Sequence, residues 1–214
     1  MTFESSLPYL SLAAALGAGI AAGRAPSGAE RVLKTVALAA LAVFAYFRWI
    51  APSSIAAALI LSALGQAALP RGGGRWRRLG TTLTVAAWLV FAWLFLRAGD
   101  GWQVLFGEGV RGGLLAAVLI GAGLGFRRLW PAIARPRTGA TADLLALMAM
   151  AAGVLTLDWE FWPAMVGALG VIAAEALMLA GAYWARLPDG AAMRGVAWTL
   201  GYMGQAAMAY AFLK

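Results

Sequence analysis

The sequence predicts an all-α membrane protein, a bundle of about eight transmembrane helices that forms one domain over residues 1–214. Hydrophobic residues make up 63% of the chain, against roughly 45–50% apolar residues in soluble domains. They gather into eight long stretches, and most charged residues fall in the short connections between them. A soluble core of this size has no room for so many apolar side chains, whereas a bilayer also solvates the outer face of each helix.

Charges and Gly/Pro clusters separate the eight stretches. Most approach the roughly 17–25 residues that cross a hydrocarbon core about 30 Å thick. Val32–Phe47 and Gly112–Phe126 are shorter, so we expect flanking residues to extend them. Each stretch is expected to be helical, because backbone groups in lipid have no water to bond. The stretches are Leu7–Gly23, Val32–Phe47, Ser53–Leu69, Leu79–Leu96, Gly112–Phe126, Ala142–Leu157, Phe161–Trp184 and Gly195–Leu213.

The first stretch has an alternative reading as a secretory signal peptide. However, the segment before it carries Glu4 and no Lys or Arg, the reverse of a secretory n-region. We therefore expect Leu7–Gly23 to be the first membrane span. The pairs Gly19/Gly23 and Gly121/Gly125 are small residues four apart, and they predict close helix contacts.

The loop charges test the helix count and predict the orientation. If the chain crosses the membrane eight times, 13 of its 17 Lys and Arg residues lie on one side. The positive-inside rule then predicts a multi-pass protein of the cell (inner) membrane, with these loops in the cytoplasm and both termini outside. Asp158 and Glu160 fall in an outer loop. The remaining basic residues are Arg48, Arg97, Arg111 and Lys214.

The composition also excludes several function classes. The net charge of +8 is not the footprint of a nucleic-acid partner, because the basic residues lie in short loops between apolar stretches. The chain has no Cys and no His, which excludes disulfides, thiol chemistry, a Ser-His-Asp triad and the usual zinc sites. No metal and no cofactor is expected, and the oligomeric state stays open.

Ionisable groups inside membrane spans are costly, so they indicate function. Glu175 lies about 15 Å from the cytoplasmic end of the seventh stretch, near mid-membrane. It is the only acid interpreted as deeply placed, because Asp143 beside the loop arginines is read as a charge near a helix N-terminus.

Other polar residues are predicted at a similar depth in the cytoplasmic half. If their helix faces converge, they line one polar pocket with Glu175. Simpler roles stay open: snorkelling for the lysine, interhelical bonding for the glutamines, and bonds to their own helix for the threonines. The residues are Lys34, Gln66, Gln205, Thr81, Thr82 and Thr84.

Four short motifs, in order along nearly the whole chain, resemble those of the YhhN-type membrane proteins, the lysoplasmalogenase family. The first opens the second span, the second closes the third, and the others lie in the last two spans. They are Arg31-Val-Leu-Lys34-Thr, Leu61-Ser-Ala-Leu-Gly65-Gln66, Gly167-Ala168 followed by Ala174-Glu175, and Tyr202-Met-Gly-Gln205.

The resemblance implies hydrolysis of the vinyl-ether bond of a lysoplasmalogen, by two intramembrane aspartates that act as acid and base. This chain departs from that pattern. Gln66 stands at the first aspartate position and cannot transfer protons usefully, Glu175 stands at the second, and Ala86 aligns near a histidine that many members carry.

Three functions follow as expectations. The first is a divergent hydrolase of a lysophospholipid or ether lipid, with Glu175 as acid/base, Gln66 orienting water, and Lys34, Gln205, Thr81 and Thr84 binding substrate. The second is a relative that binds membrane lipid without turnover. The third is a small transporter that uses Glu175 as a proton site.

Overall fold

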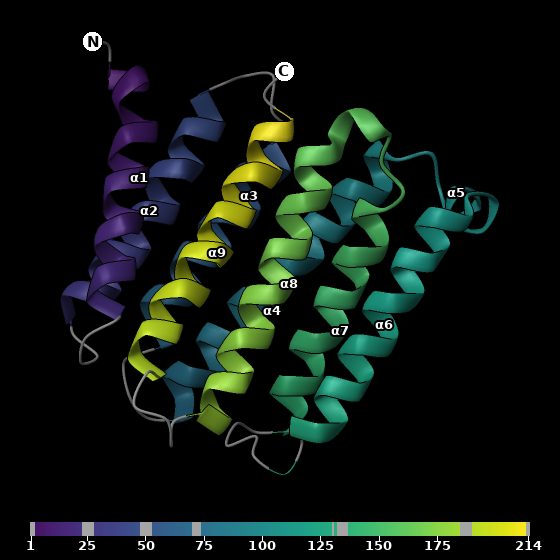
Figure 1. Ribbon diagram of the computed structural model, residues 1–214. Helices are drawn as coiled ribbons and strands as arrows, with labels where there is room; N and C mark the ends of the chain where they lie inside the picture. The colour runs from purple at the N-terminus through teal and green to yellow at the C-terminus, as the bar shows by residue number, and fades with distance from the viewer. Residues whose placement is uncertain are drawn as a thin grey trace.

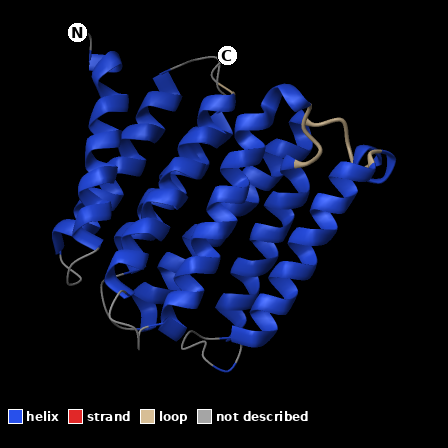
Figure 2. Ribbon diagram, viewed as in Figure 1, coloured by secondary structure: helices blue, strands red, loops and turns tan. Residues whose placement is uncertain are grey.

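The computed structural model describes residues 3–22, 28–47, 53–69, 74–129, 131, 137–184 and 190–212. Within these ranges the chain is helical and contains no strand (Figure 2). Eight helices are long, and α5 and the 3-10 helix η3 are short. The elements are α1 (Phe3–Ala22), α2 (Gly28–Phe47), α3 (Ser53–Ala68), α4 (Gly74–Ala98), α5 (Gln103–Gly107), α6 (Gly109–Leu129), α7 (Arg137–Val154), η3 (Trp159–Phe161), α8 (Trp162–Trp184) and α9 (Gly190–Ala211).

Each of the eight apolar stretches coincides with one long helix. The two short stretches are extended by flanking residues, as expected, so α2 has 20 residues and α6 has 21. The prediction missed α5, and it did not anticipate the burial of Arg111, which it counted among the loop charges of the outer side. Arg111 lies in the first turn of α6 and is buried.

The long helices lie side by side and alternate in direction along most of the chain (Figure 1). Helices α1, α2, α3, α4 and α7 pack in sequence, while α9 packs on both α8 and α1. A smaller contact between α7 and α8 closes this arrangement, and α6 lies at its edge with only small contacts to α7 and α8. The helices therefore surround a common core, from which α6 stands apart.

The side-chain sizes fit a helical bundle whose outer face meets lipid. Alanine is the commonest buried hydrophobic residue, whereas large side chains such as Ile20, Leu64, Ile120 and Tyr210 are exposed. Lipid solvates large apolar groups, so helices in membranes pack through small residues. Among the described residues, three helical segments are long and apolar enough to cross a membrane: Gly74–Ala98, Gly109–Arg128 and Trp159–Met178.

The described basic residues divide between the two ends of the bundle. Most lie at the end where α1, α3, α6 and α8 finish, and Arg97 and Arg111 lie at the opposite end. We call the first the basic end and the second the outer end. Several residues used in the orientation argument lie outside the described residues: Arg24, Arg48, Arg71, Arg135, Arg186 and Lys214.

Glycines set how closely the helices approach. A Cβ at Gly167 would lie 2.5 Å from the carbonyl oxygen of Gly204, so the α8 and α9 backbones are in direct contact there. Gly19 packs against Thr199 of α9, as its small-residue motif predicts, and Gly23 lies outside the described residues. The prediction for Gly121/Gly125 was wrong, because a Cβ at either position would meet nothing within 4 Å.

Gly167→Ala is expected to lower the free energy of unfolding by about 1–3 kcal/mol, because the methyl group would push the α8 and α9 backbones apart. Gly121→Ala is the matched control. It adds a methyl group in open space and improves helix propensity, so it should be neutral or slightly stabilising. Thermal unfolding of the detergent-purified variants measures both effects, and equal midpoints for the two would contradict the packing described here.

Candidate functional site

Glu175 is buried at 8% exposure in α8 and lines a cavity of about 310 Å³ between α6, α7 and α8. It is the only polar side chain among the described residues that line this cavity. The cavity exists because α6 packs loosely and turns Gly121 and Gly125 toward it instead of larger side chains. The other lining residues are Val118, Ala122, Phe126, Leu144, Leu147, Met148, Leu169, Ile172, Ala173 and Ala176.

Asp143 is a second buried acid, which the sequence interpretation missed. It lies in the second turn of α7, at 7% exposure, and not in a solvated first turn. Asp143 is therefore a buried acid in addition to Glu175, near the start of its helix. A usable signal was the position of Asp143 on the apolar face of α7 that also carries Ala146, Leu147 and Met150.

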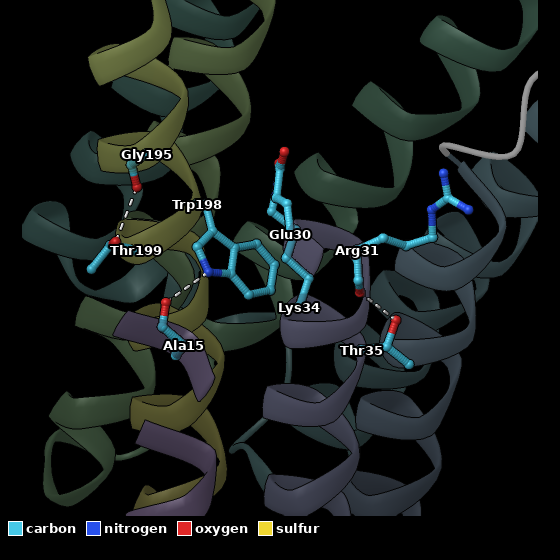
Figure 3. A network of polar contacts seen from close by, with 8 residues as sticks. All are labelled: Ala15, Glu30, Arg31, Lys34, Thr35, Gly195, Trp198 and Thr199. Atoms are coloured by element: carbon cyan, nitrogen blue, oxygen red, sulfur yellow. Dashed lines mark hydrogen bonds and ion pairs between the residues drawn. The ribbon is translucent and has the colours of Figure 1, made fainter. Parts of the chain in front are cut away.

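Lys34 lies at a different corner of the bundle, between α1, α2 and α9 (Figure 3). Its Nζ forms a 2.7 Å ion pair with Glu30 and lies 5.0 Å from the centre of the Trp198 ring. The Trp198 indole in turn donates a 3.2 Å hydrogen bond to the carbonyl oxygen of Ala15. The lysine is thus held by a carboxylate and a ring within the bundle.

One turn further into the same corner, Ser11 joins three helices. Its hydroxyl donates a 2.6 Å hydrogen bond to the carbonyl oxygen of Ala37 and lies 2.6 Å from the hydroxyl of Tyr202. Tyr202 belongs to the last of the four sequence motifs. Its role in the structure is to tie α9 to α1 and α2.

Gln205 is buried, but it does not lie at the depth of Glu175. In the antiparallel α8/α9 pair, Gly201 faces Ala174 and Gly204 faces Gly167. This register places Gln205 beside the segment near residue 168, about 10 Å along α8 from Glu175. The depth prediction for Gln205 was wrong because α9 begins at Gly190 and not at Gly195.

Among the described residues, the buried polar atoms without a hydrogen-bond partner include Gln205 Oε1, Ser62 Oγ and Trp88 Nε1. Their residues belong to α9, α3 and α4. An unpaired polar atom in the core costs about 1–3 kcal/mol, so each of these atoms is a place where water or a ligand atom would be stabilised.

The threonines mostly bond their own helix. Thr81 donates to the carbonyl oxygen of Arg77, and Thr84 donates to that of Gly80, both at 3.0 Å. The Thr84 hydroxyl also packs against Gly65, where a Cβ would lie 2.7 Å from it. Gln66, the next residue of α3, is half-buried.

The six predicted site residues therefore do not line one polar pocket. Glu175 lies on the α6/α7/α8 cavity, Lys34 lies in the α1/α2/α9 corner, and Thr81 lines a separate groove between α4 and α7. None of the other five, nor Thr82, lines the cavity at Glu175. Within the described part of the chain, no group of three or more acidic side chains is arranged to hold a metal ion.

A network of polar contacts at the outer end was also missed. Arg111 is 2% exposed, and its guanidinium donates to the carbonyl oxygens of Leu155 and Leu157 at 3.2 and 2.7 Å. It also forms a 2.7 Å ion pair with Glu108 and stacks on the Trp159 ring. These contacts tie the start of α6 to the end of α7 and supply partners for an otherwise costly buried charge.

Asp100, in the turn after α4, shares a hydrogen bond with Asp158, and this bond together with the Asp158 charge raises the pKa of Asp100. The positive charge of Arg111 lowers the pKa of Asp100 and so partly opposes this increase. The folded state favours protonated Asp100, so the hydrogen bond to Asp158 stabilises the folded protein fully below the ordinary pKa of 3.8. This contribution is lost as the pH rises through the raised pKa of the folded state.

Asp100→Asn should therefore unfold at a higher temperature than the wild type at pH 7.5, because the amide can donate to Asp158 without a proton from solvent. The difference should shrink as the pH falls from 7.5 toward the ordinary pKa of 3.8, because the raised pKa of Asp100 lets this acid take up its own proton as the pH falls. Thermal unfolding across this pH range measures it. Glu160→Gln, an acid on the same surface, is the control and should show no such crossover; a constant difference for Asp100→Asn would argue against the shared proton.

Comparison of the chain with protein-family models, with curated proteins and with solved structures finds no match. The resemblance to the YhhN-type proteins therefore rests on the four sequence motifs.

Proposed function

We propose that this chain crosses the membrane eight times, with the basic end in the cytoplasm, and that it hydrolyses the vinyl-ether bond of a lysoplasmalogen or a related lysolipid. The observation that carries the proposal is a buried carboxyl, Glu175, on the wall of an otherwise apolar cavity. The cavity lies next to a loosely packed helix at the edge of the bundle, α6, where a lipid chain could enter from the bilayer.

The reaction needs an acid in an apolar place. Glu175 in its protonated form would donate its proton to the vinyl carbon farther from the oxygen, leaving positive charge on the carbon bonded to oxygen. The carboxylate that remains would stabilise this charge and accept a proton from the attacking water. The resulting hemiacetal would collapse to a fatty aldehyde and a free glycerol hydroxyl, so one water is consumed.

Several residues enter the proposal with changed roles. Asp143 supplies a second buried carboxyl on the helix that forms one wall of the cavity, so it becomes the candidate partner acid, a role that the amide of Gln66 cannot fill. Lys34 is paired with Glu30 in another corner, which does not support a role in binding the substrate phosphate. Gln205 lies about 10 Å from Glu175 along the bundle and is better suited to holding water or joining helices.

The apolar lining also supports a second candidate, a lipid-binding relative without turnover. A cavity in which Glu175 is the only polar group among the described lining residues holds a chain well, but none of the other described lining residues can position water. Purified protein that retains lysolipid and releases no aldehyde would favour this function over hydrolysis.

Glu175→Gln should lower the rate of aldehyde release from lysoplasmalogen by at least about 100-fold, because the amide cannot supply the proton. Lysolipid retention should change little, since the side-chain shape is preserved. Asp143→Asn tests the partner acid in the same assay, and Glu160→Gln on the outer surface serves as the control. Hydrolysis that persists in Glu175→Gln would refute the assigned chemistry.

Gly125→Leu should reduce lysolipid retention about tenfold or more, because the new side chain enters the cavity where the lipid chain would lie. The fold should survive, since a Cβ at Gly125 meets nothing within 4 Å. Gly113→Leu is the matched control, on the same helix in similarly open space but outside the cavity. Lipid retained after affinity purification is quantified by mass spectrometry, and equal loss in both variants would mean that the cavity does not hold the lipid.

A further inference from the structure

A second hollow lies at the basic end, on the other side of α7 from the Glu175 cavity. It is a groove of about 510 Å³ between α4 and α7. Arg77 and Arg78 line it together with three threonines, and no acidic side chain is among its described lining residues. The remaining members are Thr81, Thr82, Val85, Thr138, Gly139 and Ala142. Nothing in the proposed hydrolysis uses this groove.

Its polar groups are arranged for an anion. Both arginines are exposed, and guanidinium groups bind phosphate through two parallel hydrogen bonds. Thr82 and Thr138 make no hydrogen bond to the described residues, so their hydroxyls are available as donors. Helices α4 and α7 both start at this end, so the positive ends of their dipoles add to the arginine charge.

The groove is also amphipathic along α4. The arginines lie at its basic end, and Val85 lies two turns further in, about 12 Å from Arg77 along the helix. Beyond Val85, the same helix exposes Leu89 and Trp93. A free phosphate would use only the first part of this path, whereas a phospholipid would use all of it. Basic pockets between membrane helices commonly bind anionic lipid head groups.

We propose that the α4/α7 groove binds the phosphate of an anionic phospholipid of the leaflet at the basic end. The head group contacts Arg77, Arg78 and the Thr82 and Thr138 hydroxyls, and the acyl chain follows Val85 toward Leu89. This lipid is a structural or regulatory partner and not the substrate, so its binding is independent of Glu175.

The test uses the full chain in phosphatidylcholine nanodiscs that contain a small fraction of phosphatidic acid. Retained phosphatidic acid is quantified after affinity purification. Arg77→Gln/Arg78→Gln should lower its retention about tenfold, since both bidentate phosphate contacts are lost. The charge-matched control is Arg75→Gln/Arg127→Gln, which removes two exposed arginines at the same end but outside the groove, and retention should change less than about twofold. Equal losses in the two double variants would overturn the proposal, because the basic surface would then act without a specific site.

A competition experiment distinguishes a lipid from a free anion. Millimolar inorganic phosphate should leave the lipid bound; displacement by micromolar phosphate would show that the site takes a free anion and that the lipid assignment is wrong.

If the double glutamine variant does not fold, Thr138→Val gives an independent measure, with an expected loss of lipid retention of about threefold. Thr35→Val, whose hydroxyl bonds its own helix at Arg31, should have no effect. Retention that is unchanged in Thr138→Val and in Arg77→Lys/Arg78→Lys would overturn the proposal. Glu175→Gln should retain phosphatidic acid like the wild type, which separates this site from the proposed hydrolysis.

Discussion

Direct backbone contact through glycine is the constraint on which the architecture depends. Where a helix turns glycine to its neighbour, the two backbones meet and the pair is closely packed, as at Gly167 and Gly204 between α8 and α9. Gly153 of α7 makes a similar approach to the backbone of α4 at Ala92. Helix pairs in lipid gain little from burying apolar surface, so this close van der Waals packing supplies much of their association.

Helix α6 shows the consequence of lacking such contacts. Its glycines at positions 121, 123 and 125 face open space, and several of its large side chains, such as Ile120 and Leu124, are exposed. The helix therefore stays at the edge of the bundle, and the space that it leaves becomes the cavity at Glu175. The same residue type that joins α8 to α9 leaves a cavity beside α6, and only the neighbours of each glycine distinguish the two cases.

The sequence was sufficient to predict where the helices lie along the chain, but it was insufficient to predict the contacts between them. Hydropathy locates all eight long helices, because each apolar stretch is long and its ends are marked by charges or by Gly/Pro clusters. The burial of Glu175 also follows from its position within a single stretch. By contrast, the role of Arg111 depends on carbonyl oxygens in the turn after α7, and the burial of Asp143 depends on the helices around it. The prediction of the depth of Gln205 was wrong for a related reason. The five extra residues at the start of α9 move Gln205 by about 7 Å along the helix.

The depth of Glu175 determines how a lysolipid would have to lie. Trp184, the end of α8, is nine positions after Glu175, so Glu175 lies about 14 Å below the basic end of that helix. In a lysoplasmalogen the vinyl-ether bond adjoins the glycerol, close to the head group. Hydrolysis at Glu175 therefore requires the glycerol to descend into the bundle beside α7, where Asp143 is buried. A lipid that keeps its head group at the surface would instead place mid-chain methylenes against Glu175, which is the arrangement expected for lipid binding without turnover. The two proposed functions thus differ in one structural quantity, the depth of the glycerol relative to Glu175.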